Sequence, residues 1–257
     1  MASNAPGNCC ATGFKHEGNP AGELVNIRGV QNYIARPADQ RSPEKVVIIL
    51  SDIFGVSFIN NQLLADDFAA RGYLAIVPDL FKGDPIRFGD IEDIKVQLPS
   101  WFPNHQPIHV DPIVESTIQY VRDDLGATRV AAAGYCFGAK YVCRYLKDGG
   151  FDVGYLAHPS HVSHEELAPI SGPLSIAASE IDEIFTTQLR HESEDILIKN
   201  GQPWQINLYG GVTHGFAVRT DLSNMSWKFA KEQAFVQAVD WFNHYLYVNE
   251  GKSFFFS

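Results

Sequence analysis

The stretch RVAAAGYCFG, residues 129–138, joins a buried strand to a sharp turn, and it decides the fold. Its apolar first part, 129–135, predicts a strand, and the pattern from about 137 to 147 predicts a helix. From residue 46 onward, short apolar runs alternate with helical patterns in the same way. This alternation is typical of βαβ units, so the sequence predicts an α/β fold with a mostly parallel sheet covered by helices on both faces.

The other predicted elements extend this sheet to about eight strands. The segments 23–29 and 30–37 predict an antiparallel pair at one edge. No repeat or linker divides the sequence, so we expect one domain over 1–257. Residues 80–109 contain several prolines and little periodicity, which predicts a functional loop or lid. The remaining predicted strands are 46–52, 73–79, 153–158, 173–178 and 204–209, and the remaining predicted helices are 60–72, 110–125, 184–198 and 226–247.

Composition and charge exclude several classes of protein. The chain is 45% hydrophobic, which excludes a mainly disordered protein, and its net charge of −10 with no basic stripe argues against nucleic-acid binding. The N-terminus lacks a secretory signal pattern, and no apolar run approaches the length of a membrane span. Four cysteines are too few and too badly spaced for a disulfide framework, so Cys9, Cys10 and Cys143 are interpreted as structural or incidental.

These observations predict a cytoplasmic protein, a monomer or a homodimer, that acts on a small molecule and not on a membrane. The C-terminal SFFFS, 253–257, is expected to pack on the domain or on a partner subunit.

The pentapeptide GYCFG, 134–138, has the Gly-x-Cys-x-Gly spacing of a nucleophile elbow. In such an elbow the nucleophile occupies a strained strand-to-helix turn, and Gly134 and Gly138 remove side chains that would collide with the neighbouring backbone. A helix N-terminus also favours the thiolate form of cysteine. Cys136 is therefore the predicted nucleophile, and the alternative is a buried cysteine that serves as a small apolar residue.

A thiol nucleophile needs a base and an acid further along the chain. His214 lies in a turn directly after the predicted strand 204–209, whereas the other late histidines fall inside helical patterns. Glu180, Asp182 and Glu183 all follow the strand 173–178, and we choose Asp182 as the acid that orients the imidazole. These three acids are equally explained as first-turn residues favoured by a helix dipole.

The oxyanion of a tetrahedral intermediate requires backbone donors. One is expected to be the N–H of Phe137, immediately after the nucleophile. The other is expected to be the N–H of Ile53, in the loop DIFGV, 52–56, after the first central strand.

Four motifs in this order, DIFG, GYCFG, EIDEIF and THGFAVR, resemble those of the dienelactone hydrolase family of α/β-hydrolases, and the N-terminal CCATG resembles its fungal branch. The resemblance covers nearly the whole chain. It implies an α/β-hydrolase fold with an eight-stranded sheet and no large cap domain. It also implies that Cys136 is the nucleophile, Asp182 the acid of the triad and His214 the general base.

Two positions depart from the family pattern. Asp52 stands where the family commonly has a glutamate that holds the proton of the resting cysteine. Arg219 lies one residue further from the histidine than the arginine that binds a substrate carboxylate in bacterial members. A solvated or structural arginine is an equal alternative. The weaker candidates for the substrate pocket are Asp52, Phe81, Lys82, Trp101, His158 and Arg219, together with Phe102.

The segment HPSHVSH places His158, His161 and His164 at three-residue intervals, but no cysteine or carboxylate cluster completes a zinc site, so we expect no metal and no cofactor. The sequence thus predicts a hydrolase that opens a lactone, ester or thioester through an acyl-cysteine intermediate with a Cys-His-Asp triad. Two alternatives remain. One is a catalytically silent α/β-hydrolase scaffold that binds a small molecule or a protein. The other is an enzyme of secondary metabolism that uses the same site for ring opening or isomerisation.

Overall fold

The structure is a computed structural model, and it describes residues 1–38, 45–89 and 91–247. Eight strands form one sheet in the order β1-β2-β4-β3-β5-β6-β7-β8. Strands β1 and β2 form the predicted antiparallel pair, β2 also pairs antiparallel with β4, and the pairs from β4 to β8 are parallel. The strands are β1 (Glu23–Ile27), β2 (Val30–Ala35), β3 (Val46–Leu50), β4 (Leu74–Pro78), β5 (Val130–Tyr135), β6 (Val153–Ala157), β7 (Leu174–Ile181) and β8 (Trp204–Thr213). The eight-stranded, mostly parallel sheet is confirmed; the predicted packing of 253–257 lies outside the described residues.

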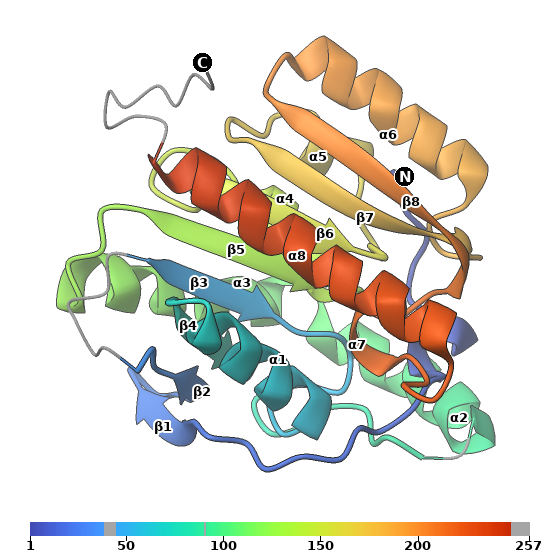
Figure 1. Cartoon of the computed structure of the whole chain (residues 1–257), viewed down its shortest axis with the longest axis horizontal. Coiled ribbons are helices and arrows are strands. Elements are labelled where there is room, and N and C mark those ends of the chain that lie inside the picture. Colours follow the sequence, from blue (N-terminus) through green and yellow to red (C-terminus); the bar gives the residue numbers. More distant parts are fainter. Residues whose placement is uncertain (39–44, 90, 248–257) are drawn as a thin grey trace.

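Helices cover both faces of the sheet, and Figure 1 shows α1 and α8 lying in front of it. Successive residues of β3 point to opposite faces, as the pleat of a strand requires. Ile48 is buried on the side of α3 and α4, whereas Val47 and Ile49 are buried on the side of α1 and α8. The helices are α1 (Ile59–Ala70), α2 (Ile91–Trp101), α3 (Pro107–Gln119), α4 (Gly138–Tyr145), α5 (His164–Leu167), α6 (Thr187–Asn200), α7 (Phe216–Arg219) and α8 (Met225–Tyr247). Short helical turns are η1 (Asn8–Ala11), η2 (Phe102–His105) and η3 (Tyr120–Asp124).

The segment 80–109 is more regular than the sequence predicts, because it contains α2 and η2 in place of a loop. Ile94, Leu98 and Trp101 are buried, and their spacing of four and three residues places them on one face of α2. This apolar stripe is short, and Pro99 lies inside the helix, which hides the periodicity. The predicted loop is therefore wrong for this part of the segment.

The first residues of the chain form a strap across the ends of the parallel strands. We call residues 2–14 the N-terminal strap. Its start is fixed by the backbone N–H groups of Ala2 and Ser3, which donate to the Val162 carbonyl at 2.9 and 3.0 Å. Its end is fixed by the N–H of Phe14, which donates to the Arg219 carbonyl at 2.9 Å. In Figure 1 this dark blue segment runs from beside β8 past α7.

Among residues 1–38, 45–89 and 91–247, no helix is both long and apolar enough to cross a membrane.

Candidate active site

Cys136 occupies the turn between β5 and α4, with a positive φ of 50° that a residue with a side chain rarely adopts. A Cβ on Gly134 would lie 2.7 Å from the Ala139 Cα, and a Cβ on Gly138 would collide with the carbonyl oxygen of Leu50. The strand, the tight turn and the helix start can therefore meet only because both flanking positions lack side chains. This is the local geometry that the GYCFG spacing predicts.

The Gly138→Ala substitution tests this close approach. Because the obstructing atom belongs to the backbone of β3, a side-chain rotation cannot relieve the contact. We expect the free energy of unfolding to fall by about 2–3 kcal/mol, the upper part of the range for overpacking. Urea unfolding followed by circular dichroism measures this, and Gly83→Ala serves as control because a Cβ there meets open space within 4 Å. Gly83 has positive φ, so a small cost is expected in the control. Equal losses in the two variants would contradict the steric argument.

His214 follows β8, and its imidazole Nδ1 lies 2.9 Å from Oδ2 and 3.1 Å from Oδ1 of Asp182. Asp182 comes directly after β7. Its carboxylate also accepts hydrogen bonds from the backbone N–H groups of Ile184 and Phe185 and from the Ser179 hydroxyl, at 2.8, 3.0 and 2.8 Å. These donors fix the carboxylate, which in turn fixes the ring of His214.

The two neighbouring acids lie elsewhere. The Glu180 carboxylate accepts a hydrogen bond from the backbone of Gly211 at 2.6 Å, and Glu183 is exposed. The structure thus brings Asp182 alone of the three acids onto the imidazole.

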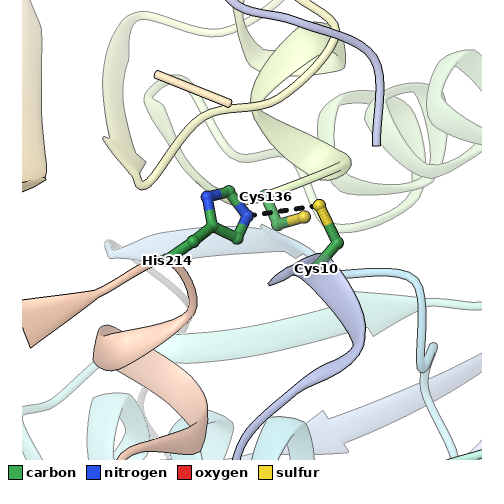
Figure 2. A group of neighbouring side chains, drawn as sticks. All are labelled: Cys10, Cys136 and His214. Carbon is green, nitrogen blue, oxygen red and sulfur yellow. Dashed lines mark hydrogen bonds between the residues drawn. The ribbon is translucent and has the colours of Figure 1, made fainter. Parts of the chain in front are cut away.

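The other ring nitrogen of His214 faces two sulfur atoms (Figure 2). Nε2 lies 3.4 Å from the Sγ of Cys10, a residue of the N-terminal strap. The Sγ of Cys136 lies within 4.8 Å of both atoms. Cys136 and Cys10 are fully buried, and His214 is 2% exposed. The nucleophile candidate therefore lies beneath the strap, beside a second thiol.

The electrostatic surroundings favour a thiolate–imidazolium pair. Burial by itself disfavours the Cys136 thiolate, but hydrogen bonding from Cys10 and the positive charge of His214 lower its pKa well below the ordinary value. Burial also disfavours the charged form of His214. The carboxylate of Asp182 and the sulfur of Cys136 nevertheless raise the pKa of His214 to about 10. Burial raises the pKa of Cys10 well above its ordinary value, so Cys10 is the protonated partner.

Two backbone N–H groups near Cys136 are the predicted oxyanion donors. In the part of the chain that the structure describes, neither the amide of Ile53 nor that of Phe137 donates to a protein acceptor. Phe137 precedes α4 directly, and Ile53 lies in the turn after β3, the strand next to β5. Both amides therefore retain a free donor, and their role as oxyanion donors stays a prediction.

Asp52 and Arg219, both weak candidates for substrate contact, form a fully buried ion pair with each other. Asp52 also accepts a hydrogen bond from Asn61 at 3.1 Å. Arg219 donates from Nε to the Thr12 carbonyl at 3.1 Å, and its guanidinium lies 5.3 Å from the centre of the Phe54 ring. Burial raises the pKa of Asp52, a rise that the charge of Arg219 opposes. The geometry therefore supports a structural role for Arg219. Its guanidinium pairs with Asp52 and donates a hydrogen bond to the N-terminal strap.

The remaining pocket candidates divide into two groups. Phe81 and Trp101 are buried and pack edge-to-face against the ring of Phe137, at centroid distances of 5.2 and 5.7 Å, so they lie beside the candidate site. Lys82 is exposed and lines a separate cavity together with residues of the β1–β2 hairpin, and the structure does not bring it to Cys136. Phe102 packs edge-to-face on the ring of His161.

The three histidines of HPSHVSH do not converge. His158 is fully buried, its ring centre lies 5.0 Å from that of His214, and burial holds its pKa well below the ordinary value, so it is a neutral packing partner. The Nε2 of His164 lies 3.4 Å from a carboxylate oxygen of Glu192. In the described ranges, the groups of residues that could ligate a metal do not include His158, His161 or His164.

Cys10 is the site residue that the sequence analysis missed, because it was interpreted as structural or incidental. The adjacent pair Cys9–Cys10 in a chain of four cysteines was a signal, but only the folded path of the strap connects it to His214, 204 positions away.

Known proteins resemble this chain over nearly its full length. The profile described as "Dienelactone hydrolase family" matches residues 30–246. "Hydrolase pyvD" of Aspergillus violaceofuscus is 46% identical over 96% of this chain and 99% of its own length, and "Hydrolase tropI" of Talaromyces stipitatus is likewise 46% identical over 96% and 99%. A putative dienelactone hydrolase from Klebsiella pneumoniae superposes with a TM-score of 0.71 at 19% identity, covering 88% of this chain and 98% of its own, which supports the shared fold. The chain is therefore a hydrolase that belongs to the dienelactone hydrolase family.

Proposed function

We propose that this protein hydrolyses a lactone, an ester or a thioester through an acyl-cysteine intermediate on Cys136. The observation that carries the proposal is the convergence of three groups at the elbow: the Asp182 carboxylate is hydrogen-bonded to His214, and the ring of His214 lies within 4.8 Å of the Cys136 sulfur. Cys136 itself occupies a turn with positive φ. A nucleophile, a base and a group that orients the base are the parts that covalent acyl transfer requires.

The proposed reaction has two halves. With its proton already on His214, the Cys136 thiolate attacks the carbonyl carbon, and the resulting oxyanion accepts hydrogen bonds from the Ile53 and Phe137 amides. The C–O or C–S bond to the leaving group then breaks, and His214 gives the leaving group the proton. In the second half, His214 takes a proton from water, the hydroxide attacks the thioester, and Cys136 leaves as the free acid forms.

The sulfur nucleophile limits the substrate class. A thiolate attacks carbonyl carbon well and is also a good leaving group, so an amide intermediate would expel the thiolate and return to substrate. Activated acyl groups, such as enol lactones, aryl esters and thioesters, have leaving groups that compete with the thiolate. The buried rings of Phe81, Trp101 and Phe137 beside the site favour an apolar or aromatic acyl group.

Rapid quenching after mixing with p-nitrophenyl acetate tests the intermediate. We expect the intact mass to increase by one acetyl group, mapped by peptide sequencing to Cys136, with a burst of nitrophenol of about one equivalent. Cys143→Ala, which removes a buried cysteine outside the site, is expected to keep the adduct. An adduct that persists in Cys136→Ala would refute the assignment. Oxygen from labelled water must appear in the acid product, and its absence would favour isomerisation instead.

A second candidate is a catalytically silent scaffold that binds a small molecule or a protein. The observation that favours it is the complete burial of Cys136 beneath Cys10. The same quench experiment decides between the two, because a silent scaffold forms no acyl adduct and releases no burst of nitrophenol.

We further propose that residues 1–257 fold as a single domain in the cytoplasm, with a small molecule as the substrate. The single sheet that runs from β1 to β8 supports one domain. The four free cysteines support a reducing compartment such as the cytoplasm.

A further inference from the structure

Three atoms that bind soft metal ions converge at the centre of the site. They are the Sγ of Cys10, the Sγ of Cys136 and the Nε2 of His214, and all three lie within 4.8 Å of one another (Figure 2). In the proposed hydrolysis the second sulfur and the ring take part in bond making and proton transfer, whereas Cys10 only donates a hydrogen bond to the Cys136 thiolate. Cys10 is also fully buried, which makes it a fixed part of this group.

The spacing of these atoms suits a tetrahedral zinc ion. Zinc binds thiolate sulfur at about 2.3 Å and imidazole nitrogen at about 2.0–2.1 Å, so two ligands of one zinc ion lie about 3.5–3.8 Å apart. The Cys10 Sγ and the His214 Nε2 already lie 3.4 Å apart. Two thiolates and a neutral imidazole also balance the two positive charges of zinc, so the buried complex carries no net charge.

The other side of the imidazole provides an independent argument. A histidine that binds a metal usually donates its second ring N–H to a carboxylate, which fixes the tautomer and the orientation of the ring. His214 has this partner, because its Nδ1 lies 2.9 Å from Asp182 Oδ2. With the proton on Nδ1, the lone pair of Nε2 points at the sulfur of Cys10.

We propose that Cys10, Cys136 and His214 form a zinc site with three protein ligands, in which the N-terminal strap supplies one of the three. Binding releases two protons, one from the thiol of Cys10 and one from the Cys136–His214 pair, and no electron is transferred. Coordination occupies the sulfur and the ring nitrogen that the proposed hydrolysis needs, so zinc is an inhibitor of that reaction. The inhibition rests on the proposed function, whereas the binding does not.

Cobalt(II) makes the binding visible without any turnover. Titration of the full-length, metal-free protein with cobalt is expected to give the intense visible bands of tetrahedral coordination and a near-ultraviolet band from two thiolates. Cys10→Ser is expected to halve the near-ultraviolet band and to weaken zinc binding, measured by displacement of cobalt, by at least about 100-fold. Asp182→Asn is expected to weaken it by about 10–100-fold.

Two controls separate this site from other thiols. Cys9→Ser changes the adjacent residue, whose sulfur lies near Asp182 and His214 but not in the group with Cys136, and Cys143→Ala changes a buried cysteine of α4. Both are expected to keep the zinc affinity within about threefold. Equal losses in the Cys9 and Cys10 variants, or a wild-type spectrum with one thiolate or none, would overturn the proposal.

The two proposals fail in different ways. A cobalt spectrum with two thiolates, together with hydrolysis that zinc leaves unchanged, supports the metal site and contradicts the role of Cys136 as nucleophile. A wild-type protein without the cobalt bands, whose Cys136→Ala variant is inactive, contradicts the metal site and leaves the proposed hydrolysis standing.

Discussion

Cys136→Ala is expected to lower kcat/KM for an activated ester by at least about 10⁴-fold, the largest effect that the site geometry predicts. The substitution removes the atom that forms the acyl intermediate, while the amides of Ile53 and Phe137 and the base His214 stay in place. The small remaining rate then comes from substrate binding and the oxyanion donors alone. Steady-state release of nitrophenol over a range of p-nitrophenyl acetate concentrations provides the measurement.

Cys143→Ala is the matched control for this experiment, because Cys143 is also a buried, free cysteine but lies within α4 and packs in the core. Its kcat/KM is expected to stay within about twofold of the parent. Thermal unfolding of both variants verifies that they are folded. A Cys136→Ala protein that hydrolyses the ester as fast as the parent would place the nucleophile elsewhere.

Arg219→Met is expected to lower the free energy of unfolding by about 3–5 kcal/mol, because it leaves the carboxylate of Asp52 charged and unpaired in the interior. Methionine fills much of the space of the arginine stem, so the lost packing against Phe54 is small compared with the lost charge partner. Urea unfolding monitored by far-ultraviolet circular dichroism gives the value.

The double variant Asp52→Asn/Arg219→Met isolates the electrostatic part of this loss. Asparagine keeps the shape of Asp52 and its hydrogen bond to Asn61 but carries no charge, so we expect the double variant to recover at least about half of the stability that Arg219→Met loses. The single Asp52→Asn variant completes the cycle. If the stability losses of the two single variants add up to the loss of the double variant, the ion pair between Asp52 and Arg219 does not contribute to stability in solution.

The local parts of the fold were predictable from the sequence. Residues 129–138 specify a strand, a turn and a helix start through neighbours only a few positions apart. Gly134 and Gly138 stand at the positions where a side chain would collide with the neighbouring backbone, so their spacing predicts the tight turn. The position of His214 after β8 was also predictable, because the carboxyl ends of neighbouring parallel strands meet at one edge of the sheet. The helix α2 was not, because Pro99 and a stripe of only a few apolar residues conceal its period.

Pairings between distant segments could not be predicted. Asp52 and Arg219 were weak candidates for substrate contact, with a structural role as an equal alternative for Arg219, and only their approach across 167 positions shows that they form an ion pair with each other. The pair Cys9–Cys10 and the motif CCATG draw attention to Cys10 but do not place it, since its position beside His214 depends on how the strap is held at Val162 and Arg219. Such contacts depend on the tertiary path of the chain, which a local pattern does not contain.

The strap has a consequence for biosynthesis. The sulfur of Cys10 and the ring of His214 meet across 204 positions, so Cys10 leaves the ribosome long before His214 does. A nascent chain that stops before β8 carries Cys136 in its elbow but has neither the imidazole nor a docking place for Phe14. The proposed site is therefore complete only after β8 and His214 have been synthesised.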